Sequence, residues 1–133
     1  DNPGGTPVNK KMTIAQLFEN IPTHLAVDDI TTLTATASNL ASSFATAIDL
    51  SGASGDVAFT LDNGTDVGQL KLIYQKTEPA STHAANITVT SFGSGTSSSN
   101  QISQNSQGEA VICIWDGSNW YILANFNSTV TLS

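Results

Sequence analysis

Apolar and polar residues alternate with a period of two along most of the chain from residue 30 onward. In DVAFTL the apolar residues Val57, Phe59 and Leu61 occupy every second position, and the same spacing recurs in NITVTSF at residues 86–92. Successive side chains of a β-strand point to opposite faces, so this period predicts strands with one face in a core. The Thr-rich alternation of TTLTATAS predicts a further strand, because β-branched side chains suit a pleated surface.

The segment QLKLIYQK, residues 69–76, shows the same alternation around a lysine. Its spacing predicts that Leu70, Leu72 and Tyr74 lie on the core face and that Lys71 lies on the opposite face. We therefore expect Lys71 to be exposed and to be a candidate residue for binding a partner.

The turn before this segment, DNGTDVG, contains acids and glycines that also occur in phosphate and calcium loops. A phosphate loop needs a lysine directly after its second glycine, whereas a glutamine follows Gly68 here. Asp62, Asn63 and Asp66 offer oxygens for calcium, but the glutamate that completes an EF-hand loop is missing. The turn is therefore expected to be architectural, with Gly64 allowing a positive φ.

The strongest local signal is EAVICIWDGSNWYILAN, residues 109–125. Two apolar runs flank the Asp116–Asn119 tetrapeptide, whose residue types predict the turn of a β-hairpin. The first run is apolar on both faces, which predicts a central strand covered from both sides. Cys113 lies inside this run and is expected to be a small buried hydrophobe. We expect the following side chains in the core: Phe59, Leu72, Ile112, Ile114 and Trp120.

Three other segments complete the predicted β region. SFATAIDLS predicts a strand, with a helix over residues 39–47 as an open alternative, and STVTLS at the C-terminus predicts an edge strand. The low-complexity residues 93–108 predict a surface loop anchored by Ile102, with a short strand as an alternative. Residues 30–133 are therefore predicted to form an all-β domain, an antiparallel β-sandwich or jelly-roll-like fold.

Residues 1–29 lack the alternation and are predicted to form an N-terminal arm with a short helix or helical turn. The first part is rich in proline and glycine, whereas MTIAQLFENIP places apolar residues at helical intervals before Pro22 ends the pattern. This apolar stripe must dock either on its own domain or on a neighbouring subunit, because so short a helix is marginal in water. We expect these arm residues to bind a partner: Lys10, Lys11, Leu17, Phe18 and Ile21.

Charge excludes some classes of partner. Eleven acids face four lysines and no arginine, which gives a formal net charge of −7. Nucleic acids and anionic membranes require clustered basic side chains, so both are disfavoured. A single cysteine excludes an intrachain disulfide framework. Because a small β domain leaves sheet edges that a cyclic assembly can cover, we expect a homo-oligomer, and specifically a homotrimer.

The sequence shows no catalytic motif. His24 and His83 have no other ligand at metal spacing, and none of the serines lies in a G-x-S-x-G motif. We expect no enzymatic activity, no cofactor and no bound metal. A carboxylate pair in a glycan-processing enzyme remains an open alternative, because separation in space is not visible in the sequence.

With the strands placed, the chain resembles a β module that recurs in structural proteins of tailed bacteriophages, including cyanophages and other marine phages. The resemblance rests on the DNGT turn at Asp62, the GQLKLI segment at Gly68 and the closing DGSNWYIL hairpin, and it covers about residues 54–126. Similar modules occur in capsid decoration (cement) proteins and in tail fibres.

The resemblance implies a structural protein of the virion, located on the capsid surface. Small size, a docking arm and the missing catalytic motif favour a decoration protein that binds the major capsid protein and stabilises the head exterior. The alternative is a receptor-binding or glycan-binding tail fibre or knob domain. In that case Trp115, Trp120 and Tyr121 are candidate sugar contacts, although packing within the hairpin is the preferred interpretation.

Overall fold

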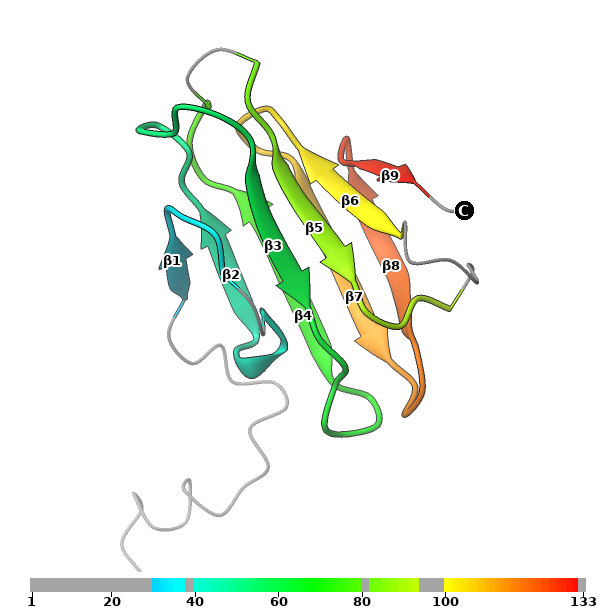
Figure 1. Ribbon diagram of the computed structural model, residues 1–133. Coiled ribbons are helices and arrows are strands. Elements are labelled where there is room, and N and C mark those ends of the chain that lie inside the picture. The colour runs from blue at the N-terminus through cyan, green and yellow to red at the C-terminus, as the bar shows by residue number, and fades with distance from the viewer. Residues whose placement is uncertain (1–29, 38–39, 80–81, 94–99, 132–133) are drawn as a thin grey trace, which may run out of the picture.

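The computed structural model describes residues 30–37, 40–79, 82–93 and 100–131. They form two β-sheets that pack face to face around one core (Figure 1). The predicted arm lies outside the described residues, and with it the candidate partner-binding residues Lys10, Lys11, Leu17, Phe18 and Ile21.

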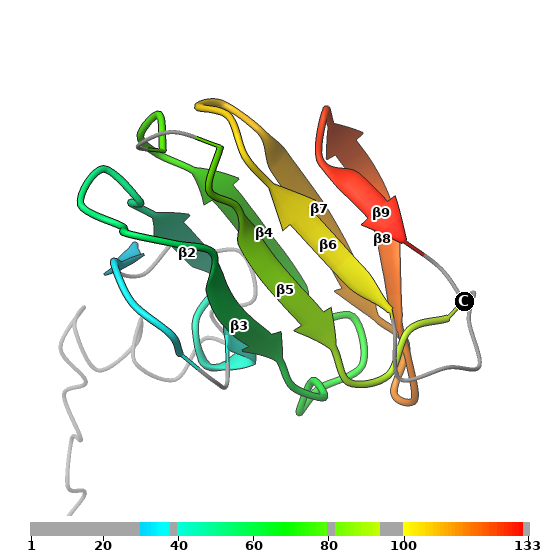
Figure 2. The same cartoon turned by 45° about the horizontal axis from the view of Figure 1, so that its top comes forward.

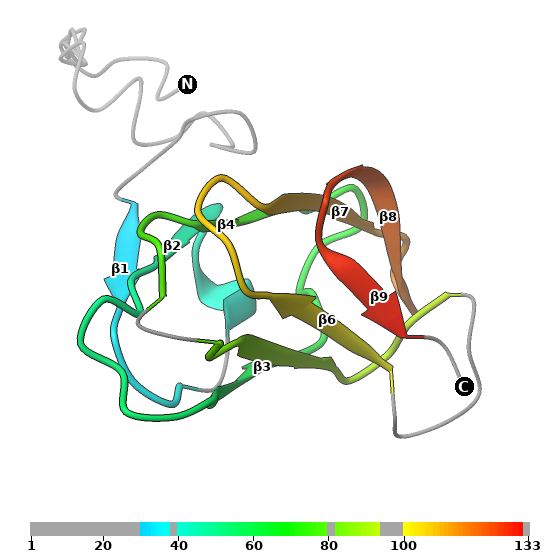
Figure 3. The same ribbon diagram turned by 90° about the horizontal axis from the view of Figure 1, so that it is seen from above.

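Nine strands and one short 3-10 turn make up the described part of the chain. The five-stranded sheet has the order β1 (Thr31–Leu33), β2 (Ala45–Ile48), β4 (Leu70–Gln75), β7 (Ala110–Trp115) and β8 (Trp120–Phe126). The four-stranded sheet has the order β3 (Val57–Leu61), β5 (Ala85–Val89), β6 (Gln101–Gln104) and β9 (Thr129–Thr131). The 3-10 turn, Leu40–Ser42, precedes β2. Figure 2 shows the four-stranded sheet in front of the five-stranded one, and Figure 3 shows the two layers from above.

The sheets are mixed because the chain alternates between them. β2 and β4 belong to one sheet, whereas β3 and β5 belong to the other. After each strand the chain crosses to the other sheet and then returns, so β4 runs parallel to β2 and β5 runs parallel to β3. The β1–β2, β2–β4 and β3–β5 pairs are parallel, and the remaining pairs are antiparallel. The predicted all-β sandwich is confirmed, but its sheets are mixed rather than antiparallel, and the jelly-roll form is not confirmed.

The core lies between the two sheets and contains the aromatic centre of the predicted hairpin. Trp115 and Trp120 pack with ring centroids 5.4 Å apart at 54°, and Phe59 of the opposite sheet is also buried. The Trp120 indole N–H donates to the carbonyl of Asp62 over 2.8 Å, which satisfies its polar group inside the core. This hydrogen bond therefore attaches the turn before β4 to the buried tryptophans of the hairpin.

Several expectations for single segments are confirmed. β7 and β8 form the predicted hairpin, with β7 inside its sheet, and the Asp116 carboxylate accepts hydrogen bonds from the backbone of Ser118 and Asn119 in the turn. Within the predicted segment 39–47, the described residues 40–47 contain the 3-10 turn and the start of β2. The low-complexity region contains the short strand β6, and β9 is an edge strand. Ile102 of β6 is fully buried, as expected of an anchor.

The predicted register of β4 is wrong by one residue. Lys71, Ile73 and Gln75 face the core and are buried, whereas Leu70, Leu72 and Tyr74 face away from it. Of the five predicted core side chains, Phe59 and Trp120 are confirmed, but Leu72, Ile112 and Ile114 are only half-buried and lie outside the core cluster.

Pairing with β7 explains the inverted register. Lys71 lies opposite Cys113, which shares the inner face of β7 with Trp115. Because directly opposite residues of an antiparallel pair share a face, Lys71 must point inward once the tryptophans occupy the core. The expectation that Lys71 is an exposed partner-binding residue is therefore corrected, since its side chain has no exposed surface.

Gly64 is required for a different reason than the one predicted. Its φ is not positive, whereas those of Gly68, Gly108 and Gly117 are. A Cβ at Gly64 would lie 2.4 Å from Cγ of Trp115, so the indole occupies the space above this glycine. The turn is architectural, as expected, but Gly64 serves packing rather than backbone conformation.

Candidate functional site

The two outer faces of the sandwich differ in chemistry. The four-stranded sheet turns mainly polar side chains outward: Ala58, Thr60, Asn86, Thr88, Gln101, Ser103, Thr129 and Thr131. The five-stranded sheet turns outward a set that we call the outer apolar face: Leu70, Leu72, Tyr74, Ala110, Ile112, Ile114, Tyr121, Leu123 and Phe126. No charged side chain belongs to this set. One layer of the sandwich is thus suited to water and the other to contact with apolar groups.

Cross-strand pairing holds the outer apolar face together. Leu70 lies opposite Ile114, and Leu72 lies opposite Ile112. Ile114 in turn lies opposite Tyr121 of β8. We use the name β4–β7 rows for the part of the face carried by these two strands: Leu70, Leu72, Tyr74, Ala110, Ile112 and Ile114. These side chains are half-buried by their neighbours, and none belongs to the core cluster.

The β8 patch, defined as Tyr121, Leu123 and Phe126, is the most exposed part of the face. The three side chains are 41%, 59% and 55% exposed. The pairing of β8 with β7 shifts between Ile112 and Cys113, which leaves Leu123 as an extra residue. A bulge of this kind changes the alternation of the strand, and it therefore brings Phe126 to the same side as Tyr121 and Leu123.

Contacts within the domain fix the position of Tyr121. The segment after β5 pairs with the start of β8, because the N–H of Gly93 donates to the carbonyl of Trp120 over 2.9 Å. A Cβ at Gly93 would lie 2.2 Å from the Tyr121 ring, so the ring packs directly on this glycine. The β8 patch thus includes one anchored aromatic ring beside two more exposed apolar side chains.

Lys71 forms a buried polar site between the sheets. Its ammonium Nζ donates to the Ser43 carbonyl over 2.9 Å, to Ser43 Oγ over 3.1 Å and to Thr46 Oγ1 over 2.6 Å. All three acceptors are uncharged. Burial lowers the pKa of Lys71 to about 7, and burial raises the pKa of the Cys113 thiol to about 12. A neutral amine is a nucleophile in principle, but the complete burial of Lys71 separates it from any dissolved substrate.

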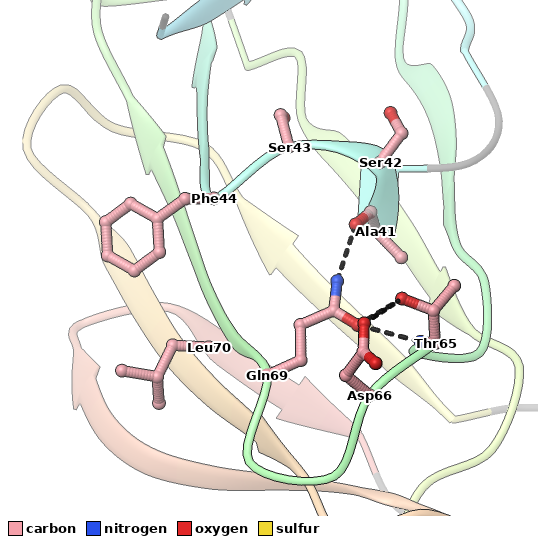
Figure 4. Close-up of a pocket in the computed structure, with 8 residues that line it drawn as sticks. All are labelled: Ala41, Ser42, Ser43, Phe44, Thr65, Asp66, Gln69 and Leu70. Carbon is pink, nitrogen blue, oxygen red and sulfur yellow. Dashed lines mark hydrogen bonds between the residues drawn. The ribbon is translucent and has the colours of Figure 1, made fainter. Parts of the chain in front are cut away.

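A small pocket of about 230 Å³ lies where the loops before β2 and β4 meet (Figure 4). Phe44 and Leu70 form its apolar end, and Thr65, Asp66 and Gln69 form its polar end. The Gln69 side chain closes the polar end, because its Nε2 donates to the Ala41 carbonyl over 2.7 Å and its Oε1 accepts from the Thr65 N–H over 2.8 Å.

The pocket is coupled to the buried lysine through its wall. Ser43 lines the pocket and also accepts two hydrogen bonds from Lys71. Lys71 therefore positions this wall from the core side. The pocket offers a carboxylate at the end opposite an aromatic ring.

The metal sites considered from the sequence are the next candidates. Within the ranges that the structure describes, no three His, Cys, Asp or Glu side chains converge on a metal position. The calcium candidate Asp62 instead uses its backbone carbonyl for Trp120, and its carboxylate accepts from Thr90 over 3.4 Å. In the same ranges, no helix has the length and apolar character needed to cross a membrane.

Sequence reasoning missed the outer apolar face, although the signal was present. β7 is apolar on both faces, as its sequence AVICIW shows, and β4 carries Leu70, Leu72 and Tyr74 on its outer face. A strand that is apolar on both faces predicts cover on both sides.

No family model matches this chain, and a comparison with curated proteins found no match. Inference about function therefore rests on the geometry of the described residues together with the sequence resemblance.

Proposed function

We propose that this protein is a structural component of a phage virion, a capsid decoration protein that binds the head exterior as a homotrimer. The observation that carries the structural part of the proposal is the β8 patch, three large apolar side chains exposed on one edge strand. The phage part is supported by the resemblance of the turn before β4 and of the closing hairpin. The partner that we propose is the major capsid protein, and the location is the capsid surface.

The exposed position of the β8 patch supports an assembly role. Apolar side chains that gather on one surface favour protein contact, whereas single exposed apolar residues are ordinary. Tyr121 adds a rigid aromatic ring, a residue type enriched at the centres of interfaces. A patch without charge also lets copies of a protein with a net charge of −7 meet where no like charges oppose each other.

The sheet edges give less support to the trimer than the sequence suggested. Two edge strands, β1 and β9, are only three residues long, and isolated bridges join Ala37 to Phe59 and Phe92 to Trp120 beside the other two. Short or covered edges have little tendency to pair with another chain. The contact between subunits in the proposed trimer is therefore assigned to the β8 patch.

The copy number in purified particles tests the proposed location. A decoration protein that covers the head is expected in hundreds of copies per particle and should bind heads that lack it, in proportion to their capsid protein. A few to a few dozen copies would place it in the tail instead and would contradict the decoration role.

A second candidate function, glycan binding in a tail fibre or knob, is favoured by the pocket beside Phe44. Sugar sites combine a ring face with carboxylate or amide acceptors, and here Asp66 and Gln69 lie across from Phe44. Titration with monosaccharides and host glycans, monitored by NMR shifts of Thr65 to Leu70, distinguishes the two functions. Saturable shifts that disappear in Asp66→Ala would favour the fibre.

A further inference from the structure

The β4–β7 rows need a cover that differs from that of the β8 patch. Their largest side chains, Leu70, Leu72, Tyr74, Ile112 and Ile114, form two adjacent rows without a charged neighbour in the set. Their half-buried state reflects contacts along the rows, since none of them belongs to the core cluster. Leaving such rows in water forgoes burial that typically contributes about 25 cal/mol per Å² of apolar surface.

We propose that residues 13–21 of the same chain pack as a short helix on the β4–β7 rows. This segment, TIAQLFENI, holds Ile14, Leu17, Phe18 and Ile21 at helical spacing. The one charged residue within it, Glu19, falls on the opposite side of such a helix. An uncharged stripe would thus meet an uncharged face, with the charge directed to solvent.

The sizes of the two surfaces agree. A helix of nine residues is about 14 Å long at ~1.5 Å per residue and about 10 Å wide. Two strands span roughly 10 Å at ~4.8 Å each, and the five residues from Leu70 to Tyr74 extend about 16 Å. A second copy of the protein is a poorer fit, because a stable pair buries about 800 Å² on each partner and these rows present on the order of 200 Å².

The connection to β1 allows the segment to reach its own domain. β1, β2 and β4 run parallel, and Thr31 at the start of β1 lies level with Ile73, so the chain enters β1 from the side of the sheet on which Leu70 begins β4. Two strand spacings, about 10 Å, separate β1 from β4. The nine residues 22–30 extend up to about 30 Å, which exceeds this distance comfortably. Within one chain the effective concentration of the segment is high, which favours its own domain over a neighbouring copy.

The inference is independent of the particle to which the protein binds. It would hold for a tail protein as well as for a decoration protein, and it would fail without affecting the copy number in virions. The two proposals can therefore be tested separately.

Disulfide trapping in the full chain tests the contact. In Leu17→Cys with Leu72→Cys, mild oxidation with copper-phenanthroline should form a bond within one chain, because docking brings the two positions within disulfide reach. As a control, Leu17→Cys with Thr88→Cys should form no disulfide, because Thr88 lies on the polar outer face of the other sheet. Buried Cys113 does not compete, since its thiol is inaccessible and its pKa is raised to about 12. Cross-linked dimers would show that the segment covers a neighbouring copy, and no cross-link would show that another surface covers the rows; either result would overturn the proposal.

Dye binding tests the same contact if the cysteine variants fold poorly. Phe18→Ser should increase binding of the dye ANS several-fold, because it uncovers the β4–β7 rows, whereas the adjacent Glu19→Ser should leave dye binding unchanged. Equal dye binding by both variants and the unmodified protein would contradict docking of this stripe.

Discussion

Leu72 of β4 and Ile112 of β7 lie directly opposite each other, and both face away from the core. The next pair along the same two strands, Lys71 and Cys113, faces into it. The sandwich therefore places a lysine inside and a row of apolar side chains outside. This inversion defines both the buried polar site and the outer apolar face.

The first prediction concerns the two faces of β4. Ile73→Ala should lower the free energy of unfolding by about 2–5 kcal/mol, because it empties space in the core. Leu72→Ala should cost clearly less, since that side chain is half-buried on the outer face. Urea denaturation of both variants measures the difference. A larger loss for Leu72→Ala would contradict the register.

The second prediction concerns pH and Lys71. Its pKa is about 7 in the folded protein and 10.5 in the unfolded chain, so above pH 7 the unfolded chain binds more protons than the folded one. Stability should therefore rise from pH 7 to about pH 9. Above pH 9 the Cys113 thiol opposes this rise, because it ionises near 9 when unfolded but near 12 when folded.

The Lys71→Met variant isolates this effect. Urea unfolding between pH 6 and pH 9 should show a rising free energy in the unmodified protein and a flatter profile in the variant. In Lys76→Met, which changes an exposed lysine directly after β4, the free energy of unfolding should still rise with pH. An equally steep profile in Lys71→Met would show that another group titrates.

The third prediction concerns Gly64. Gly64→Ala should lower the free energy of unfolding by about 1–3 kcal/mol, because the new methyl group would overlap the buried Trp115 ring. Gly52→Ala is the matched control, since a Cβ there meets nothing within 4 Å and φ is not positive. Similar stability of the two variants in thermal denaturation would contradict the packing of Trp115 on Gly64.

The sequence predicted the elements better than their faces. Alternation located β3, β4 and β5, and turn chemistry located the β7–β8 hairpin, because both are local signals. The inner and outer faces of β4 could not be distinguished, since Leu72 and Ile73 are equally apolar and a lysine such as Lys71 ordinarily indicates the solvent side. Only the pairing of Lys71 with Cys113, 42 positions further along, decides the face.

The candidate site was less accessible to sequence reasoning. A lysine is rarely buried without an acid as its partner. No sequence pattern therefore predicts the hydrogen bonds of Lys71 to Ser43 and Thr46. The grouping of Leu123 with Phe126 depends on the bulge in β8, which no spacing rule predicts. The arrangement of the sheets was also hidden, because the chain alternates between layers and generates parallel pairs.

The central claim is that the β8 patch is an assembly surface. Sedimentation equilibrium of the full chain at micromolar concentration tests it most directly, with Leu123→Asp as the probe and Thr88→Asp as the matched control on the polar face. The account predicts a trimer for the unmodified protein and for Thr88→Asp, and a folded monomer for Leu123→Asp, because a charge in the contact would lose its solvation. A monomeric unmodified protein, or a Leu123→Asp variant that remains trimeric, would contradict it.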